Sequence, residues 1–96
     1  MSSIGTKSFE ITGDFTDNKR VWNIFLSSIH QSGATIFGIV KHEFYPQGFT
    51  GIVIIGESHI AIHTFPEEQK AWVEFASCGD MTKGEVFEAA LRARLI

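Results

Sequence analysis

Two alternating runs of residues, one on each side of a turn, constrain this fold more than any other feature. Residues 59–65 alternate His, Ala, His and Phe with Ile, Ile and Thr, which is the period of a β-strand. Residues 70–78 form a second strand-like run, and the intervening Pro66–Gln69 has turn chemistry. These signals predict a β-hairpin, and therefore a sheet that contains antiparallel strands.

The register of this hairpin follows from its turn. Because side chains alternate between the two faces of a strand, one assumed pair fixes all the others. We expect the cross-strand pairs Phe65–Lys70, His63–Trp72, His59–Ala76, Ile62–Val73, Ile60–Phe75 and Glu57–Cys78. Ser58 has the opposite parity to His63, so Ser58 reaches His63 and Cys78 only if the strand bends at Glu57 and Ser58. Gly56 permits such a bend.

The remaining segments follow the order strand, helix, strands, helix. We expect a strand at Lys7–Thr12 and then a helix at about Asp17–Ser32, which Thr16 or Asp17 caps. Strands at Ala34–Phe44 and Phe49–Ile55 should follow, with a turn at Pro46–Gly48 between them. After a break at Gly79–Asp80, we expect a second helix that Thr82 caps and that reaches Leu95. This order predicts an α+β two-layer sandwich: one antiparallel sheet with two helices on one face, formed by residues 1–96 as a single domain.

Composition excludes several classes of function. The net charge is −3 and the eight Lys and Arg residues are scattered, so we expect no nucleic-acid partner. The apolar run at residues 51–56 is too short to span a membrane, and the start of the chain lacks signal-peptide features, so we expect a cytoplasmic protein. The single cysteine and the histidine spacing predict neither a disulfide nor a metal site. A chain of 96 residues buries a small core, which oligomerisation would help to stabilise.

The stretch Gly56–Pro66 carries unusual polar chemistry for a strand. Ser58, His59 and His63 stand among isoleucines, and buried polar groups need partners, so this stretch is either at a sheet end or at a functional site. Without further information, Ser58 is a hydroxyl at a strand end, His63 is a hydrogen-bonded core histidine and His59 only shapes the turn. Cys78 is a small buried apolar residue in the same interpretation.

A family resemblance favours the functional site. The run Glu57-Ser58-His59-Ile60-Ala61-Ile62-His63-Thr64-Phe65-Pro66-Glu67, followed by Ser77-Cys78-Gly79, resembles the bacterial and archaeal S-adenosylmethionine decarboxylases. So do Ser32-Gly33-Ala34-Thr35, His42-Glu43-Phe44-Tyr45-Pro46-Gln47-Gly48 and Gly51. Several short motifs in this order are far more specific than any one of them.

The resemblance implies a proenzyme that cuts itself. The Ser58 hydroxyl would attack the Glu57 carbonyl, and His63 would assist the β-elimination that splits the resulting ester, with Thr50 and His59 in support. The products would be a chain of residues 1–57 and a chain of residues 58–96 that begins with a covalent pyruvoyl cofactor. Thr50 stands where the family commonly has Ser.

The resemblance also implies the substrate and its contacts. The pyruvoyl group would form a Schiff base with S-adenosylmethionine and act as the electron sink while carbon dioxide leaves, and Cys78 would then donate a proton to the α-carbon. Phe44 and Phe65 would sandwich the adenine, and Glu67 would bind the ribose hydroxyls. Phe65 replaces the Trp that the family usually has. The product would serve spermidine biosynthesis as an aminopropyl donor. Members of the family usually form dimers, so the resemblance also implies a homodimer, which agrees with the small core.

Two alternatives stay open at this point. A pyruvoyl decarboxylase of the same fold could act on arginine or ornithine. Alternatively, the chain is an unprocessed, non-catalytic homologue that serves as a binding or subunit module, which the altered residues 68–72 motivate. In that interpretation Phe44 and Phe65 are core residues, and Glu67 is a solvated turn residue.

Overall fold

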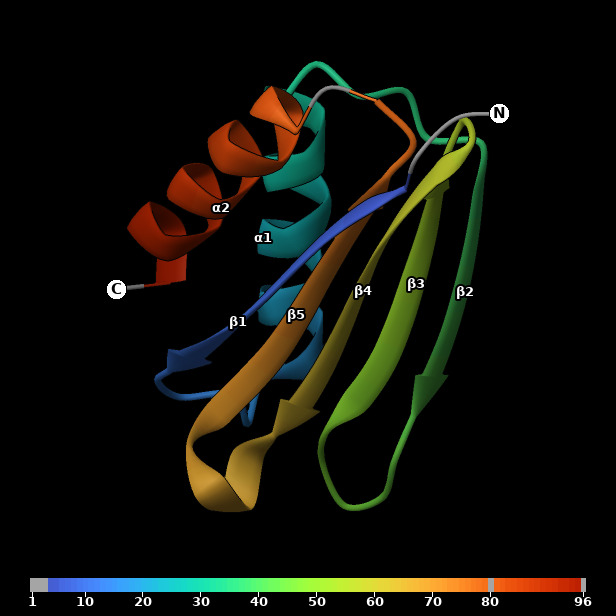
Figure 1. Ribbon diagram of the computed structural model, residues 1–96. Coiled ribbons are helices and arrows are strands. Elements are labelled where there is room, and N and C mark those ends of the chain that lie inside the picture. Colours follow the sequence, from blue (N-terminus) through green and yellow to red (C-terminus); the bar gives the residue numbers. More distant parts are fainter. Residues whose placement is uncertain (1–3, 80, 96) are drawn as a thin grey trace.

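The computed structural model describes residues 4–79 and 81–95 (Figure 1). Asp80 of the expected strand break, together with residues 1–3 and 96, lies outside the described residues. The elements, in chain order, are β1 (Gly5–Thr12), α1 (Asn18–Gln31), β2 (Gly38–Glu43), β3 (Phe49–Ile55), β4 (Ser58–Phe65), the short 3-10 helix η1 (Pro66–Glu68), β5 (Lys70–Ser77) and α2 (Thr82–Leu95).

The strands form one five-stranded sheet in the order β1-β5-β4-β3-β2, and every neighbouring pair is antiparallel. Both helices pack on the same face of this sheet (Figure 1). The predicted α+β sandwich is therefore confirmed. None of the helices in the described part of the chain is long and apolar enough to cross a membrane.

The predicted register of the β4–β5 hairpin is confirmed. Phe65 pairs with Lys70 and His63 with Trp72, and the pairs toward the strand ends follow in the expected order. The turn between them is the 3-10 helix η1, after which Gln69 adopts a left-handed conformation with φ of 54°. Each strand therefore presents every second side chain to the helices, as the alternation of residue types required. These buried side chains are those of Ile60, Ile62, Val73 and Phe75.

The strand expected at Ala34–Phe44 is shorter than predicted. β2 begins only at Gly38, which pairs with Ile54. β3 ends at the next residue, Ile55, and therefore offers no partner to residues 34–36. At the other end, Phe44 leaves the ladder, and its N–H donates to the Gly48 carbonyl to close a turn with a cis Tyr45–Pro46 bond. This segment therefore forms a strand only where a neighbouring strand can pair with it, although its β propensity extends further.

Helix α1 begins where the sequence predicted. Asp17 is the N-cap, and its carboxylate accepts a 3.1 Å hydrogen bond from the backbone N–H of Arg20. The apolar side of the helix then packs on the sheet. Its buried members are Val21, Trp22, Phe25 and Ile29.

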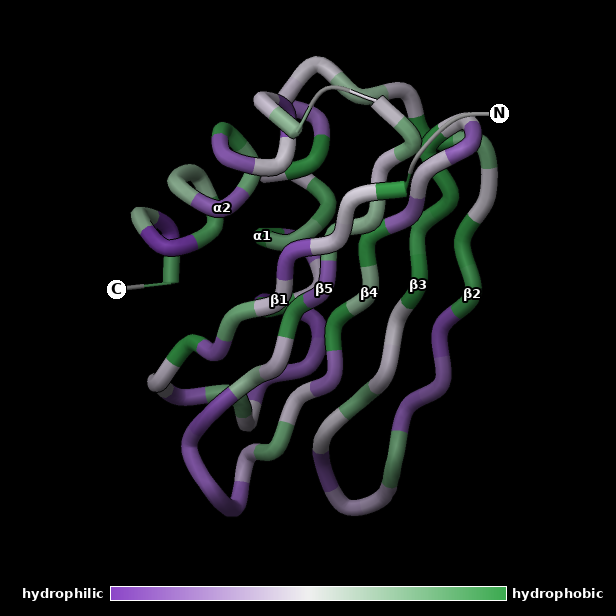
Figure 2. Tube along the Cα trace, in the orientation of Figure 1, coloured by the Kyte–Doolittle hydropathy of each residue, from purple (hydrophilic) through white to green (hydrophobic). Residues whose placement is uncertain are grey.

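The core lies between the sheet and the helices, and the opposite face of the sheet has no covering layer in the described chain. Val53, Ile60 and Val73 are fully buried on the helix side. On the other face, Val40 is 65% exposed and Ile54 is 44% exposed. Figure 2 shows this apolar character along the upper parts of β2 and β3. Exposed apolar side chains that gather on one face are typical of interaction surfaces.

Candidate functional site

Ser58 lies at the first position of β4, directly after a two-residue hairpin turn. Gly56 and Glu57 form this turn, and Gly56 has a φ of +71°. Two-residue hairpin loops need a positive φ, which glycine adopts without a steric penalty. The turn therefore places the peptide bond between Glu57 and Ser58 at the end of the sheet. The bend expected within the strand at Glu57 and Ser58 is absent, because Gly56 instead forms a tight turn and Ser58 pairs regularly with Ile55, so Ser58 does not reach His63.

A cavity of about 420 Å³ opens beside this turn. Ser58 and Cys78 both line it, so the structure brings together two of the residues singled out by the sequence. The other lining residues come from the loop after α1, the ends of β3 and β5 and the start of α2, and they are Ala34, Thr35, Phe37, Ile55, Gly56, Phe75, Ser77, Gly79 and Lys83. Lys83 gives the cavity a positive charge that the sequence analysis did not anticipate.

The Cys78 thiol is bound to the residue on the other side of the turn. Its Sγ donates a hydrogen bond to Oε2 of Glu57 over 3.2 Å, in agreement with the predicted placement of Cys78 opposite Glu57. This hydrogen bond to a carboxylate is the main cause that raises the pKa of the Cys78 thiol, and burial and the Glu57 charge add to it. A contact with Ser58 acts in the opposite direction. The thiol is thus held in its protonated form, which can donate a proton.

A second cavity, of about 360 Å³, lies at the other end of β4. It gathers five of the residues that the sequence singled out: Phe44, Thr50, His63, Phe65 and Glu67. The two phenylalanines come from different segments, one after β2 and one at the end of β4, and both are partly exposed to solvent. An aromatic ring that is exposed beside a carboxylate is well suited to bind a nucleoside.

His63, which lines this cavity, is oriented by two neighbouring side chains. Its Nδ1 lies 3.2 Å from the Thr50 hydroxyl oxygen on the paired strand β3. Its ring lies 5.3 Å from that of Trp72, at an interplanar angle of 34°. The sequence analysis missed Trp72 as a neighbour with this effect, although its predicted pairing with His63 contained the signal.

Glu67 also has a partner that the sequence analysis missed. Nε2 of Gln47 donates to Oε1 of Glu67 over 3.3 Å, across the second cavity. His59, in contrast, lines neither cavity and instead contacts Glu74, with 3.3 Å between Nε2 and Oε1. His59 therefore sits between the two groups of site residues without joining either.

The two cavities lie at opposite ends of one strand. His63 follows Ser58 by five positions in β4, and a strand rises about 3.3 Å per residue, so the two residues are about 16 Å apart. Within one chain, Ser58 and Cys78 form one group and His63 and Thr50 belong to another. Across residues 4–79 and 81–95, no three His, Cys, Asp or Glu side chains gather in a way that would hold a metal ion.

Known proteins carry the same sequence pattern. A family model described as S-adenosylmethionine decarboxylase matches residues 10–95. A protein of Parasynechococcus marenigrum named S-adenosylmethionine decarboxylase proenzyme is 46% identical over 65 residues, which is 68% of this chain and 51% of that protein. A protein of the same name from Moorella thermoacetica is 44% identical over 73 residues, covering 76% of this chain and 56% of that protein. The chain thus spans about half the length of the curated relatives it matches.

The fold also has a counterpart among solved structures. The crystal structure of the adenosylmethionine decarboxylase of Aquifex aeolicus superimposes with a TM-score of 0.82 at 24% sequence identity. The match covers 96% of this chain and 78% of the other. This likeness concerns the arrangement of the strands and helices.

Proposed function

Because this chain belongs to the S-adenosylmethionine decarboxylase family, we propose that it removes carbon dioxide from S-adenosylmethionine after cutting itself at one peptide bond. The observation that carries the proposal is the position of Ser58. This residue follows the tight Gly56–Glu57 turn and borders a cavity that it shares with a protonated thiol, that of Cys78. The decarboxylated product would be an aminopropyl donor for spermidine synthesis.

The first step would use the chain's own hydroxyl. The Ser58 oxygen attacks the carbonyl carbon of Glu57, and the C–N bond breaks to leave an ester and a free amine. A base then removes the α-proton of residue 58, and the ester C–O bond breaks to release the carboxylate of Glu57. Addition of water and loss of ammonia leave a pyruvoyl group. The products are residues 1–57 and residues 58–96.

The residues around Ser58 fit such a group. A pyruvoyl group is no larger than the serine it replaces, and the cavity of about 420 Å³ leaves room for a substrate beside it. When present, it supplies a carbonyl that withdraws electrons from the substrate's α-carbon. Cys78 would then deliver its proton to that carbon, and the raised pKa of its thiol keeps the proton available at neutral pH.

The second cavity would bind the nucleoside part of the substrate. Phe44 and Phe65 offer aromatic faces for the adenine, and the Glu67 carboxylate offers acceptors for the ribose hydroxyls. An aromatic face also attracts a sulfonium cation. His63, which lies in the same cavity, would be the base of the self-cleavage step.

A single chain cannot bring the two cavities together, because about 16 Å separates His63 from Ser58. We therefore propose a homodimer in which the uncovered sheet faces of two copies pack against each other in opposite directions. In this arrangement the end of β4 that carries His63 in the partner subunit would lie over the end of β4 that carries Ser58. Exposed apolar side chains on that face, including Val40, Ile52 and Ile54, support it.

Intact-mass measurement tests the activity. We expect two fragments that divide between Glu57 and Ser58, with the later one lighter by one ammonia than a simple hydrolysis product. The Ser58→Ala variant should stay whole and release no carbon dioxide from S-adenosylmethionine. Ser27→Ala, at an exposed serine of α1, is the matched control and should behave like the parent chain. Release of carbon dioxide by Ser58→Ala at the parent rate would overturn the proposal.

Co-expression tests the dimer. A Ser58→Ala chain retains His63, and a His63→Ala chain retains Ser58, so a mixed dimer contains one complete set. We expect the His63→Ala chain to stay whole when it is expressed alone and to be cut when it is expressed with the Ser58→Ala chain. If it stays whole in both cases although mixed dimers form, the proposed sharing of residues is wrong.

A further inference from the structure

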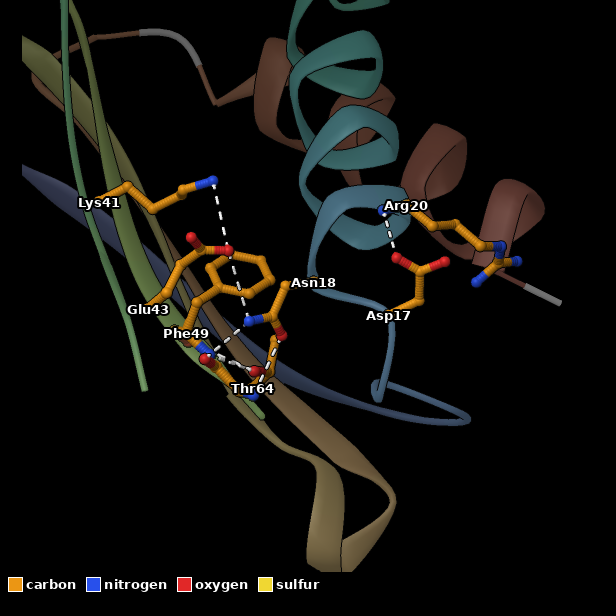
Figure 3. Close-up of polar contacts among 8 residues, drawn as sticks. Asp17, Asn18, Arg20, Lys41, Glu43, Phe49 and Thr64 are labelled. Carbon is orange, nitrogen blue, oxygen red and sulfur yellow. Dashed lines mark hydrogen bonds and ion pairs between the residues drawn. The ribbon is translucent and has the colours of Figure 1, made fainter. Parts of the chain in front are cut away.

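Asn18 bridges helix α1 and the start of β3 with both ends of its side-chain amide. Its Nδ2 donates to the Gly48 carbonyl over 3.1 Å, and its Oδ1 accepts from the Gly48 N–H over 3.0 Å. A third, longer contact of 3.5 Å joins Nδ2 to Oε1 of Glu43. Figure 3 shows the side chain extending from the helix toward Phe49 and Thr64. One side chain thus fixes the position of one backbone residue.

This bridge is not required for the start of the helix. The N-cap role belongs to Asp17, whose carboxylate accepts the bond from the Arg20 N–H. Asn18 is the first residue of the helix and is half-buried, and its side chain points away from the helix backbone. Its two short hydrogen bonds therefore stabilise the position of Gly48, in the loop between β2 and β3, rather than the helix start.

That loop forms one wall of the second cavity. Residues 44–48 connect β2 and β3, and the Phe44 N–H donates to the same Gly48 carbonyl that accepts from Asn18. Gly48 has a φ of +94°, and a Cβ added to it would lie 3.2 Å from Cδ of Pro66. The residue that Asn18 holds thus packs against the segment that carries Glu67.

The other restraints on this loop come from the sheet. The Thr64 hydroxyl accepts from the Phe49 N–H over 2.9 Å and donates to the Phe49 carbonyl over 3.4 Å. Gln47 contacts Glu67. Among the bonds described for residues 44–48, only those of Asn18 tie the loop to the helix layer, so they set the loop's position relative to the rest of the cavity.

We propose that Asn18 is a positioning residue for the nucleoside half of the substrate. It touches no substrate itself and acts by holding residues 44–48, so that Phe44 stays beside Phe65 in the lining of the second cavity. This inference depends on the proposed function only in assigning the second cavity to the adenosyl group.

The test is the Asn18→Ala variant. We expect the KM for S-adenosylmethionine to rise roughly five- to tenfold, as the loss of about one net hydrogen bond predicts, while kcat changes less than about twofold. The dissociation constant of 5′-methylthioadenosine, which has the nucleoside and sulfur but no amino-acid group, should rise by the same factor. Self-cleavage should still go to completion, because the β3–β4 ladder holds His63 and Thr50 independently of the loop.

Two further variants make the test specific. Asn23→Ala, at an exposed asparagine of the same helix, should change none of these constants. Asn18→Asp keeps the acceptor and loses the donor, and it provides a second measurement if the alanine variant does not fold. Unchanged binding of methylthioadenosine in both Asn18 variants, or a loss confined to kcat, would overturn the proposal.

Failure of the proposed function would look different. In that case the parent chain would stay whole or would release no carbon dioxide. The Ser58→Ala chain, which cannot cut itself, allows nucleoside binding to be compared with and without Asn18→Ala. A parent chain that does not bind methylthioadenosine would overturn both the assignment of the second cavity and the role of Asn18.

Discussion

Replacing Gly51 by alanine should destabilise the protein through a single contact. Gly51 lies on β3 and faces the helices, and a Cβ at this position would come within 2.4 Å of Cζ3 and 2.9 Å of Cη2 of Trp22. The indole has little room to move. Its ring stacks on Phe25 with centroids 5.4 Å apart, meets the edge of Phe49 at 5.7 Å and has the Lys41 ammonium 5.1 Å from its centroid.

The size of the effect follows from two opposing contributions. Inserting a methyl group into a packed core costs about 1–3 kcal/mol. Replacing glycine on an extended backbone recovers about 0.4–1 kcal/mol, because the unfolded chain has fewer conformations to lose. We therefore expect a net loss of about 1–2 kcal/mol in the free energy of unfolding, which corresponds to a decrease in Tm of about 5–15 °C for a domain of this size.

Thermal and urea unfolding in the Ser58→Ala background measure this loss on an uncut chain. Gly13→Ala is the matched control, because a Cβ there would lie at an ordinary 3.7 Å from the Phe15 ring. Combining Gly51→Ala with Trp22→Phe should recover about 1–2 kcal/mol relative to the sum of the single changes. Equal stability of the Gly51→Ala and Gly13→Ala chains, or additive effects in the double variant, would refute the reasoning.

Two predictions concern pH. In the Ser58→Ala background, Glu57→Gln removes the carboxylate that raises the Cys78 pKa, so the fraction of thiolate should rise. Iodoacetamide should therefore alkylate this single cysteine faster at pH 8 than in the Ser58→Ala chain alone. An unchanged or slower rate would contradict this. Lys7, 2.8 Å from Glu88, lowers the pKa of that carboxyl below its ordinary value of 4.5, so the ion pair stabilises the fold above that pH and this contribution disappears as the pH falls. The difference in urea midpoint between the parent chain and Glu88→Gln should therefore shrink from pH 6 to pH 3, and a constant difference would count against the ion pair.

The sequence predicted the hairpin well because its signals are local. The alternation of residue types and the turn at residues 66–69 together determine which residues of β4 and β5 pair, and the structure has that register. The extent of β2 could not be predicted in this way. It depends on where β3 ends, which is a property of the neighbouring strand.

The candidate site was predictable as a set of residues but not as an arrangement. Motif order identified Ser58, His63 and Cys78 together, whereas the rise per residue of a strand separates Ser58 from His63. Asn18 had no sequence signal, because its bonds join positions 30 residues apart and depend on how α1 lies over the loop. The capping pattern drew attention only to its neighbour, Asp17.

The strand order has a consequence for a chain that has been nicked after Glu57. The leading fragment would contain β1, β2 and β3, and the trailing fragment would contain β4 and β5. In the sheet, the two trailing strands lie between β1 and β3, joined by eight residue pairs on one side and six on the other. The strands of the trailing fragment therefore lie between strands of the leading fragment within one sheet. After the backbone is cut, the hydrogen bonds of both strand interfaces still hold the two fragments together, and the fragments separate only when both interfaces unfold.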